Sequence, residues 1–281
     1  MRIFHTAAEL RAALAGETGA ALVPTMGNLH AGHVSLVELA KQHGSPVVAS
    51  IFVNPLQFGA GEDFEHYPRT LAADCEKLAA AGCDIVFAPD VAEVYPVPQT
   101  FTVQVADSLA NDLCGAFRPG HFSGVATVVL KLFSLVQPRV AAFGKKDFQQ
   151  LLVIREMVRQ FNLPIGILAG DTLREADGLA MSSRNGYLSP SERTQAPALQ
   201  RELAAIAAAV RAGGREYEAL CCAAARQLEM AGWDVDYIAL RDAASLRPVD
   251  AATRRAVVLG AARLGKTRLI DNIEIALGNP L

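Results

Sequence analysis

The sequence predicts an α/β protein, with a doubly wound parallel sheet followed by a second, smaller α+β domain. Up to Gly170, short apolar runs rich in β-branched residues alternate with amphipathic stretches of helical period. After Asp177 the pattern changes to Ala-rich helical stretches and then to strand-like runs. Strands that alternate with helices form right-handed βαβ units, whose strands are parallel. We therefore expect a first domain over residues 1–174 and a smaller one over 175–281.

The expected elements follow from hydrophobic period and turn residues. The strands expected in the first domain are residues 20–24, 47–54, 84–89, 140–144 and 165–170. The helices expected between them are 34–42, 70–81, 124–136 and 148–161. The second domain is expected to contain helices at 191–212 and 216–231, then strands at 235–240, 256–259 and 268–275.

Composition excludes several classes of function. A hydrophobic content of 51% and a charged fraction of 20% are ordinary for a folded chain. The net charge of −3 offers no basic field for a phosphate backbone, so we expect no nucleic-acid partner. The most apolar stretch, 125–136, contains Lys131 and is too short to span a bilayer, so no membrane partner is expected. Five cysteines without a C-x-x-C pair are typical of reduced thiols, and we expect a cytoplasmic protein.

The first candidate site follows the strand at 20–24. The turn there ends in His30-Ala31-Gly32-His33, just before a helical pattern that starts at Val34. The N-terminus of a helix at the carboxyl edge of a parallel sheet favours anions, and imidazoles can donate hydrogen bonds to phosphate oxygens. Gly27 and Gly32 allow close approach of backbone or an adenine ring. The alternative, two surface or capping histidines, is the commoner outcome for an arbitrary pair. With this strand and helix around it, H-x-G-H is typical of the nucleotidyltransferase branch of Rossmann-like folds.

The second candidate is the run Ala180-Met181-Ser182-Ser183-Arg184-Asn185. Nucleotidyltransferases of that branch carry a distant loop similar to K-M-S-K-S. Its hydroxyl groups, backbone N–H groups and guanidinium are donors suited to a triphosphate, and arginine can bind phosphate with two hydrogen bonds. Taken alone, the run is better explained as a turn with a helix cap. Together with the two histidines it predicts one phosphate site.

Six longer runs resemble the pantothenate synthetase family (pantoate–β-alanine ligases) and occur in that family's order. They are V-P-T-M-G-N-L-H-A-G-H, S-I-F-V-N-P-L-Q-F, Y-P-R-T-L, R-P-G-H-F-S-G-V, F-G-K-K-D-F-Q-Q-L and D-G-L-A-M-S-S-R-N-G-Y-L. The later run L-I-D-N extends the likeness to Asn272. The resemblance implies ATP-dependent condensation of (R)-pantoate with β-alanine through a pantoyl-adenylate, with Mg²⁺ as cofactor, release of AMP and pyrophosphate, and a homodimer.

The resemblance also assigns residues. Its ATP contacts fall on Met26, Gly27, Asn28, Leu29, His30, Ala31, Gly32, His33, Gly144, Lys145, Lys146, Asp147, Leu173, Met181, Ser182, Ser183 and Arg184. The catalytic residues among them are His30, His33, Lys146 and Arg184, and His33 occupies the place of the proton donor. Pantoate contacts fall on Gln57 and Gln150, and the β-alanine position falls on Gln57. The ligands of the metal are not assigned.

The chemistry of these residue types supports the assignments. The amides of Gln57, Gln150 and Asn54 can bind the hydroxyls and carboxylate of pantoate without neutralising the nucleophile. His33 is expected to stabilise charge at the phosphates, because carboxylate attack on phosphorus requires no proton removal. Lys146 is the expected cation for the phosphates, and Asp147 is expected either to orient it or to approach the metal.

The sequence departs from the family at one position of the site. The family commonly reads G-E-K-D where this chain has G-K-K-D at residues 144–147, so Lys145 adds a positive charge. That charge is expected either to face solvent or to reach the phosphates. The second domain is expected to act as a lid over ATP, because its M-S-S-R run is far from His33 in sequence.

Three other interpretations compete with this one. Residues 260–267 match the P-loop pattern G-x-x-x-x-G-K-[ST], but the strand expected at 268–275 stands where a P-loop requires a helix. Another H-x-G-H adenylyltransferase, acting on a different small metabolite, would show no dependence on β-alanine. A nucleotide-sensing module without catalysis would show no turnover, but the candidate catalytic side chains are all present.

Overall fold

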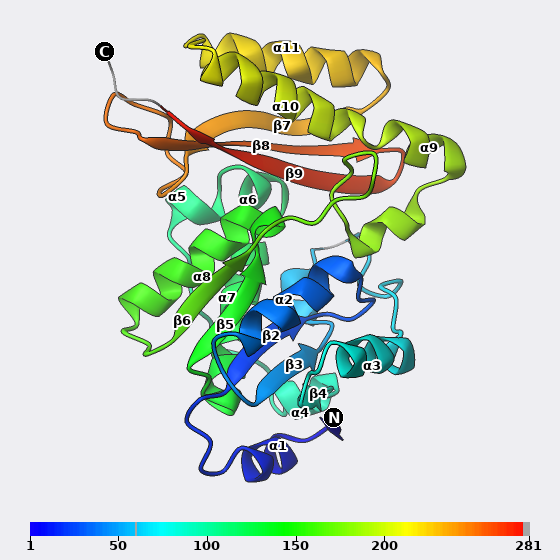
Figure 1. The fold of residues 1–281 in the computed structure, drawn as a ribbon, viewed down its shortest axis with the longest axis vertical. Coiled ribbons are helices and arrows are strands. Elements are labelled where there is room, and N and C mark those ends of the chain that lie inside the picture. Colours follow the sequence, from blue (N-terminus) through cyan, green and yellow to red (C-terminus); the bar gives the residue numbers. More distant parts are fainter. Residues whose placement is uncertain (60, 278–281) are drawn as a thin grey trace. The chain divides into compact units, whose positions relative to one another are not determined.

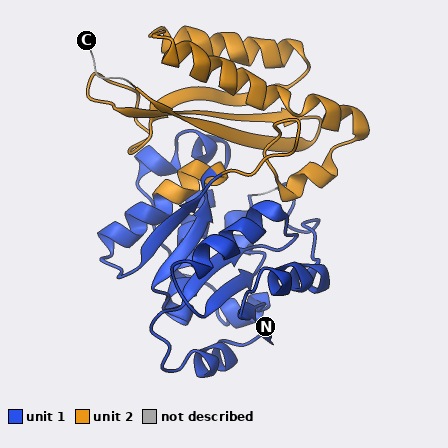
Figure 2. Cartoon of the chain, in the orientation of Figure 1, with its two compact units in different colours: residues 1–145, 153–171 blue, residues 146–152, 172–281 orange. Residues whose placement is uncertain are grey.

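The computed structural model describes residues 1–59 and 61–277, which form two compact units (Figure 2). The first unit contains residues 1–145 and 153–171, and the second contains residues 146–152 and 172–281. Residues 146–152 thus group with the second unit although they precede Asp171 in sequence. Whether each unit is a domain that folds or moves independently stays a prediction. No helix in the described part of the chain is long and apolar enough to cross a membrane.

The first unit is built on a six-stranded sheet in which every strand pair is parallel (Figure 1). Its order is β1 (Arg2–Phe4), β4 (Ile85–Phe87), β3 (Val47–Ile51), β2 (Ala21–Thr25), β5 (Val140–Gly144) and β6 (Gly166–Gly170). The chain winds outward from β2 through β3 to β4, and later strands continue on the other side from β5 to β6. The strand order therefore reverses between β2 and β5, which is the point where doubly wound sheets bind ligands at their carboxyl edge. The fold class expected from the sequence is confirmed.

The helices of this unit include α1 (Ala7–Ala13), α2 (Ala31–Lys41), α3 (Leu71–Ala80), α4 (Val91–Val94), α5 (Asp107–Ala110), α6 (Cys114–Phe117) and α7 (His121–Val136), with the short 3₁₀ helix η1 (Pro55–Gln57). Of the next 3₁₀ helix, η2 (Lys145–Asp147), only Lys145 belongs to this unit. Helix α8 (Phe148–Gln160) follows η2. Leu36 and Val37 of α2 share one buried cluster with Ala21 and Val23 of β2, so the apolar stripe of this helix covers the central strand.

Several expected boundaries differ from the structure. Strand β3 ends at Ile51, before the expected residue 54, because Asn54 caps η1. Helix α7 begins at His121, three residues before the expected start. Strand β1 and the short helices α1, α4, α5 and α6 were not expected at all. Helix α1 nevertheless carries a sequence signal, because Thr6 and Glu9 form a capping box at its start.

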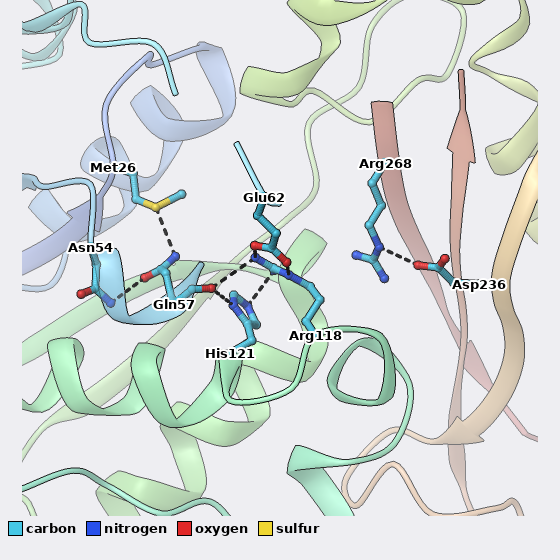
Figure 3. A network of polar contacts seen from close by, with 8 residues as sticks. All are labelled: Met26, Asn54, Gln57, Glu62, Arg118, His121, Asp236 and Arg268. Atoms are coloured by element: carbon cyan, nitrogen blue, oxygen red, sulfur yellow. Dashed lines mark hydrogen bonds and ion pairs between the residues drawn. The ribbon is translucent and has the colours of Figure 1, made fainter. Parts of the chain in front are cut away.

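The second unit contains a three-stranded antiparallel sheet in the order β7 (Asp234–Asp242), β8 (Arg255–Leu264) and β9 (Thr267–Ala276). Its helices are η3 (Ser183–Tyr187), α9 (Pro190–Gln195), α10 (Ala198–Arg211) and α11 (Tyr217–Met230). Leu203 of α10 and Leu228 of α11 lie in the same buried cluster as Val258 of β8. Arg268 Nε donates to Asp236 Oδ2 at 2.6 Å, and this ion pair joins β9 to β7 (Figure 3).

The prediction of a single helix over 191–212 is wrong, because two helices occupy that stretch. Helix α9 ends at Gln195, and Pro197 stands directly before α10. Proline has no N–H group for the helix ladder and its ring clashes with the preceding turn, so it separates the two helices.

The P-loop pattern at 260–267 lies in the β8–β9 hairpin, so the rejection of that interpretation is confirmed. Gly260 lies within β8, and a Cβ atom there would approach Leu199 and Ile238 side-chain atoms to 2.9 and 2.8 Å. Gly265 has a φ of +57° at the first of the two turn positions, where hairpins of this length favour glycine. Strand β9, not a helix, follows at Thr267. The pattern arises from a close packing contact and a turn.

The loop between β2 and α2 is fixed by two side chains of α3. Asp74 is fully buried, and its carboxylate accepts the N–H groups of Asn28 and Leu29, each at 2.8 Å, and the hydroxyl of Thr70 at 2.9 Å. Lys77 Nζ donates to the carbonyl oxygen of Leu29 at 2.6 Å. The sharp turn at this point requires Gly27, whose φ is +91°.

We predict that Asp74→Asn destabilises the protein, because the amide nitrogen would face a backbone donor in place of an acceptor. Losing a charge-assisted buried hydrogen bond costs about 1–3 kcal/mol of unfolding free energy, which urea unfolding can measure. Asp90→Asn is the matched control. Asp90 is an exposed N-cap whose Oδ1 accepts from Glu93 N at 2.7 Å, and asparagine caps equally well. If the two variants unfolded at the same urea concentration, the role given to Asp74 would be contradicted.

Candidate active site

The H-x-G-H run forms the first turn of α2, which begins at Ala31 and not at the expected residue 34. His30 is the N-cap, and its Nδ1 atom accepts the N–H of Gly32 at 3.1 Å. His33 Nδ1 accepts the N–H of His30 at 3.2 Å, which completes a capping box made of two imidazoles. The ring centroids are 4.1 Å apart. The start of α2 was expected too late because the apolar pattern begins at Val34, whereas the helix itself begins three residues earlier, at Ala31.

This capping arrangement determines the tautomer of both rings. A backbone N–H group donates to each Nδ1 atom, so Nδ1 carries no proton and the neutral imidazole has its proton on Nε2. Each ring is thereby fixed as an Nε2–H donor at the N-terminus of α2. Gly32 is required here, because a Cβ atom at that position would lie 2.8 Å from His30 Cε1. Capping and a donor role at phosphate are therefore compatible, and the second stays a prediction.

Gln57 ends the 3₁₀ helix η1, and its side-chain amide has a fixed orientation (Figure 3). Its Oε1 atom accepts from Asn54 Nδ2 at 3.1 Å, and its Nε2 atom donates to Met26 Sδ at 3.1 Å. The contact with Met26 connects η1 to the loop that leads to the two histidines. Gln57 is half-buried, and its role toward pantoate stays a prediction.

Asn54 is only 1% exposed, and protein groups use its whole amide. Its Oδ1 atom accepts from the Tyr95 hydroxyl at 2.7 Å and from Leu56 N at 3.3 Å. Its Nδ2 atom donates to Gln57 and to the carbonyl of Gly124 at 3.2 Å. Burial raises the pKa of Tyr95, so its hydroxyl stays protonated as a donor. Since an amide offers two donor and two acceptor positions, these partners account for all four.

The R-P-G-H-F-S-G-V run lies beside Gln57 and reaches its backbone. His121 Nδ1 lies 2.8 Å and Arg118 Nη2 lies 3.4 Å from the carbonyl oxygen of Gln57. Gly124 allows α7 to pack against η1, because a Cβ atom there would lie 2.1 Å from the carbonyl oxygen of Leu56. Arg118 and His121 were not among the expected site residues. Their positions in a run quoted for its resemblance were the available signal.

Glu62 completes this group as the partner of Arg118. Its two carboxylate oxygens accept from Arg118 Nε at 2.7 Å and Nη2 at 2.6 Å. Burial alone would raise the pKa of Glu62, but the hydrogen bond and charge of Arg118 outweigh it and lower that pKa. The carboxylate therefore remains charged at neutral pH, and the pair fixes the direction of the guanidinium.

In the second unit, the segment before and within the M-S-S-R run folds back on itself. The N–H of Met181 donates to the carbonyl of Leu173 at 2.9 Å, so these two predicted ATP contacts are neighbours. Ser182 caps η3, and its hydroxyl accepts from Arg184 N at 3.2 Å. The helix cap considered for this run is therefore present in the structure. Binding of phosphate by Ser183 and Arg184 stays a prediction.

The L-I-D-N run stabilises this folded segment. Asp271 forms a two-point ion pair with Arg174, at 2.6 Å to Nη1 and 3.0 Å to Nη2. Asn272 Nδ2 donates to the carbonyl oxygen of Lys146 at 2.9 Å. The motif therefore fixes the backbone at two predicted ATP-contacting segments, the one that contains Lys146 and the one next to Leu173.

The charged residues after β5 have defined partners. Lys146 Nζ lies 3.6 Å from Asp147 Oδ2, which is consistent with Asp147 orienting Lys146. Lys145 Nζ pairs with Asp171 Oδ1 at 2.7 Å, at the surface. Part of the extra charge at Lys145 is thus compensated within the protein. An exposed ion pair of this kind contributes at most about 1 kcal/mol to the free energy of unfolding.

Each unit contains part of the predicted site. The first unit contains the loop from Met26 to His33 together with Asn54, Gln57, Gly144 and Lys145. The second contains Lys146, Asp147, Gln150, Leu173 and the run from Met181 to Arg184. Gln150 is half-buried on α8. Among the described residues no cluster of three or more His, Cys, Asp or Glu side chains could bind a metal, so the metal ligands remain unassigned.

Known proteins resemble this chain over nearly its whole length. The chain is 71% identical over 275 residues to the pantothenate synthetase of Thiobacillus denitrificans, covering 98% of this chain and 97% of that protein. It is 58% identical over 277 residues to the pantothenate synthetase of Methylobacillus flagellatus, covering 99% of each.

Solved structures agree with the sequence relatives. The pantothenate synthetase of Thermus thermophilus has a TM-score of 0.94 at 48% identity and covers 98% of this chain and 100% of its own. The Francisella tularensis pantoate–β-alanine ligase, solved as a complex with β,γ-ATP and β-alanine, has a TM-score of 0.77 at 32% identity and covers 97% of each chain. The sequence profile described as pantoate–β-alanine ligase matches residues 2–274. The chain therefore belongs to the pantoate–β-alanine ligase family.

Proposed function

We propose that the protein joins (R)-pantoate to β-alanine in two steps, through a pantoyl-adenylate, with release of AMP and pyrophosphate. The chain is a ligase that makes pantothenate from pantoate and β-alanine with ATP, as its family membership and its 71% identical relative show. The observation that supports the adenylate route is the capping box of His30 and His33, which directs ring N–H donors from the N-terminus of α2. Such a site suits a polyphosphate leaving group.

In the first step the phosphates of ATP lie at the start of α2. The helix dipole and the Nε2–H groups of the two histidines would stabilise the negative charge that develops on pyrophosphate. Lys146 and Arg184 are the cations proposed to bind the same phosphates. Neutral donor imidazoles suffice for this role, since the attacking carboxylate carries no proton to remove.

Pantoate is proposed to bind through Gln57 and Gln150. Because Asn54 and Met26 fix the amide of Gln57, its orientation does not have to be selected when pantoate binds, which lowers the entropic cost of alignment. Asn54 is also retained as a proposed pantoate residue, although its four hydrogen bonds are made within the protein. In the second step the neutral amine of β-alanine, bound at Gln57, attacks the acyl carbon and releases AMP.

The other interpretations of the sequence have less support. Another H-x-G-H adenylyltransferase would not account for the pantothenate synthetases that match over 98–99% of this chain. A nucleotide-sensing module would not require the fixed amide of Gln57. The Francisella relative was solved with β,γ-ATP and β-alanine together, which agrees with a site for a nucleotide and for the amine substrate.

Three further properties are proposed from the family resemblance. Mg²⁺ would accompany ATP, and addition of a chelator should then stop turnover. The functional form would be a homodimer, which sedimentation can test. The protein would be cytoplasmic, and its five cysteines, for which no disulfide is present, agree with a reducing compartment.

We propose that residues 175–281 act as a lid domain over bound ATP. The support is that the M-S-S-R run belongs to the second unit, whereas the two histidines belong to the first. Amide hydrogen exchange over residues 178–186 should slow when ATP and pantoate are added together. Unchanged exchange at saturating ligand would contradict the lid.

His33→Ala is predicted to lower kcat by about 10²- to 10³-fold, the range for loss of one preorganised donor at a developing charge. It also removes a helix cap, so His33→Gln is the companion variant: glutamine at this position can accept the N-cap N–H and keep α2 stable. His33→Gln should unfold at nearly the wild-type temperature yet remain strongly impaired. His43→Ala, in the exposed turn that follows the same helix, should behave as wild type. A His33→Ala enzyme within threefold of wild type would contradict the assignment.

The route through an adenylate is tested by isotope transfer. Pantoate labelled with ¹⁸O in its carboxylate should transfer one labelled oxygen to AMP, because the bridging oxygen stays on phosphorus when the amide forms. Activation as an acyl phosphate would instead place the label in inorganic phosphate and release ADP. Mass spectrometry of the products distinguishes the two outcomes, and the second would exclude the roles proposed for His30, His33 and Arg184.

A further inference from the structure

We propose that His121 and Arg118 are positioning residues that set the backbone of Gln57 and thereby the affinity for pantoate. The proposal rests on the pantoate-binding role proposed above for Gln57. Neither residue is assigned to a substrate. Both act through the single carbonyl oxygen at the end of η1 (Figure 3).

The hydrogen bonds of His121 define its protonation. A guanidinium has only donors, so Arg118 Nη1, at 2.9 Å, must donate to His121 Nε2. Nε2 therefore has no proton, and the neutral ring carries its proton on Nδ1. The Nδ1–H group donates to the carbonyl oxygen of Gln57 at 2.8 Å. His121 is largely buried, so this donor has little alternative in water.

Arg118 is itself held in a fixed direction. Glu62 binds its Nε and Nη2 atoms side by side, and the pair is mostly shielded, with side-chain exposures of 15% for Arg118 and 24% for Glu62. The same guanidinium contacts Gln57 O through Nη2 and His121 through Nη1. A rigid, planar donor group of this kind fixes both partners at once.

Two separate sets of contacts determine the position of Gln57, one at its side chain and one at its backbone. Asn54 and Met26 determine where its amide group points, whereas His121 and Arg118 determine where its backbone lies. A shift of the carbonyl would displace the amide even if its local contacts persisted. Small displacements of a group that binds substrate weaken binding and alignment strongly.

The test compares two amide replacements of His121 that keep different halves of the ring. The nitrogen of asparagine can occupy the position of Nδ1 and still donate to Gln57. The amide of glutamine reaches the position of Nε2 and leaves that carbonyl with only its longer contact to Arg118 Nη2, at 3.4 Å. We expect His121→Gln to raise the KM for pantoate roughly five- to tenfold, the effect of one lost buried hydrogen bond, and His121→Asn to stay within about threefold of wild type.

Two readouts separate positioning from a loss of stability. A merely destabilised enzyme would lose active molecules and hence kcat, whereas the KM for pantoate would not change. The KM for ATP should remain within about twofold in all variants, because the histidine caps of α2 are intact. His66→Gln is the matched control, since His66 is an exposed histidine in the loop that also carries Glu62.

Gln57→Ala distinguishes a failure of this proposal from a failure of the proposed function. An unchanged KM for pantoate in Gln57→Ala would exclude the substrate role of Gln57. If that KM rises but His121→Gln leaves it unchanged, the positioning role is excluded and the function stands. In the Gln57→Ala background, His121→Gln should not raise the KM for pantoate further, and an additive increase in this KM would also overturn the proposal.

If His121→Gln does not fold, Arg118→Gln takes its place. Arg118 lies in the loop before α7, and the same rise in the KM for pantoate is expected.

Discussion

The rest of the site depends on the hydrogen bonds that the buried carboxylate of Asp74 accepts from the loop after β2. Asn28 and Leu29 lie in the loop between β2 and α2, where the backbone of neither a strand nor a helix provides an acceptor for their N–H groups. These N–H groups therefore need another hydrogen-bond partner. Asp74 accepts both. With the loop fixed, His30 occupies the N-cap of α2 and Met26 reaches Gln57. One side chain from α3 thus fixes the loop that carries both the proposed phosphate donors and the Met26 contact to the proposed pantoate-binding amide.

The same arrangement recurs in the second unit. Asp271 and Asn272 bind Arg174 and the backbone of Lys146, so the L-I-D-N run stabilises predicted ATP-contacting segments without being expected to contact ATP itself. Gly124 and Asn54 have a comparable function beside η1. Many residues of the characteristic runs are therefore explained by the hydrogen bonds and close packing that orient a smaller number of groups predicted to bind ligands.

The sequence predicted the parallel sheet, the strands of the second domain and the H-x-G-H turn, because each has a strong local period or spacing. It did not predict the interactions that join distant segments. Asp74 lies 45 residues from Leu29, and His121 lies 64 residues from Gln57, so no local pattern connects them. The start of α2 was misplaced because imidazoles are uncommon caps, and one helix was expected where Pro197 separates two. The roles of individual residues toward ATP and pantoate remain predictions.

The glycines of the β8–β9 hairpin show how a sequence pattern can arise without the chemistry that usually accompanies it. Gly260 is required by the side chains that pack over β8, and Gly265 by the reversal of the chain. These two steric demands are independent, and their spacing, followed by a lysine and a threonine, reproduces a well-known signature of nucleotide binding. A search by pattern alone would assign this chain to a second class of ATP-binding proteins. The helix or strand that follows the pattern carries the information that separates the two classes.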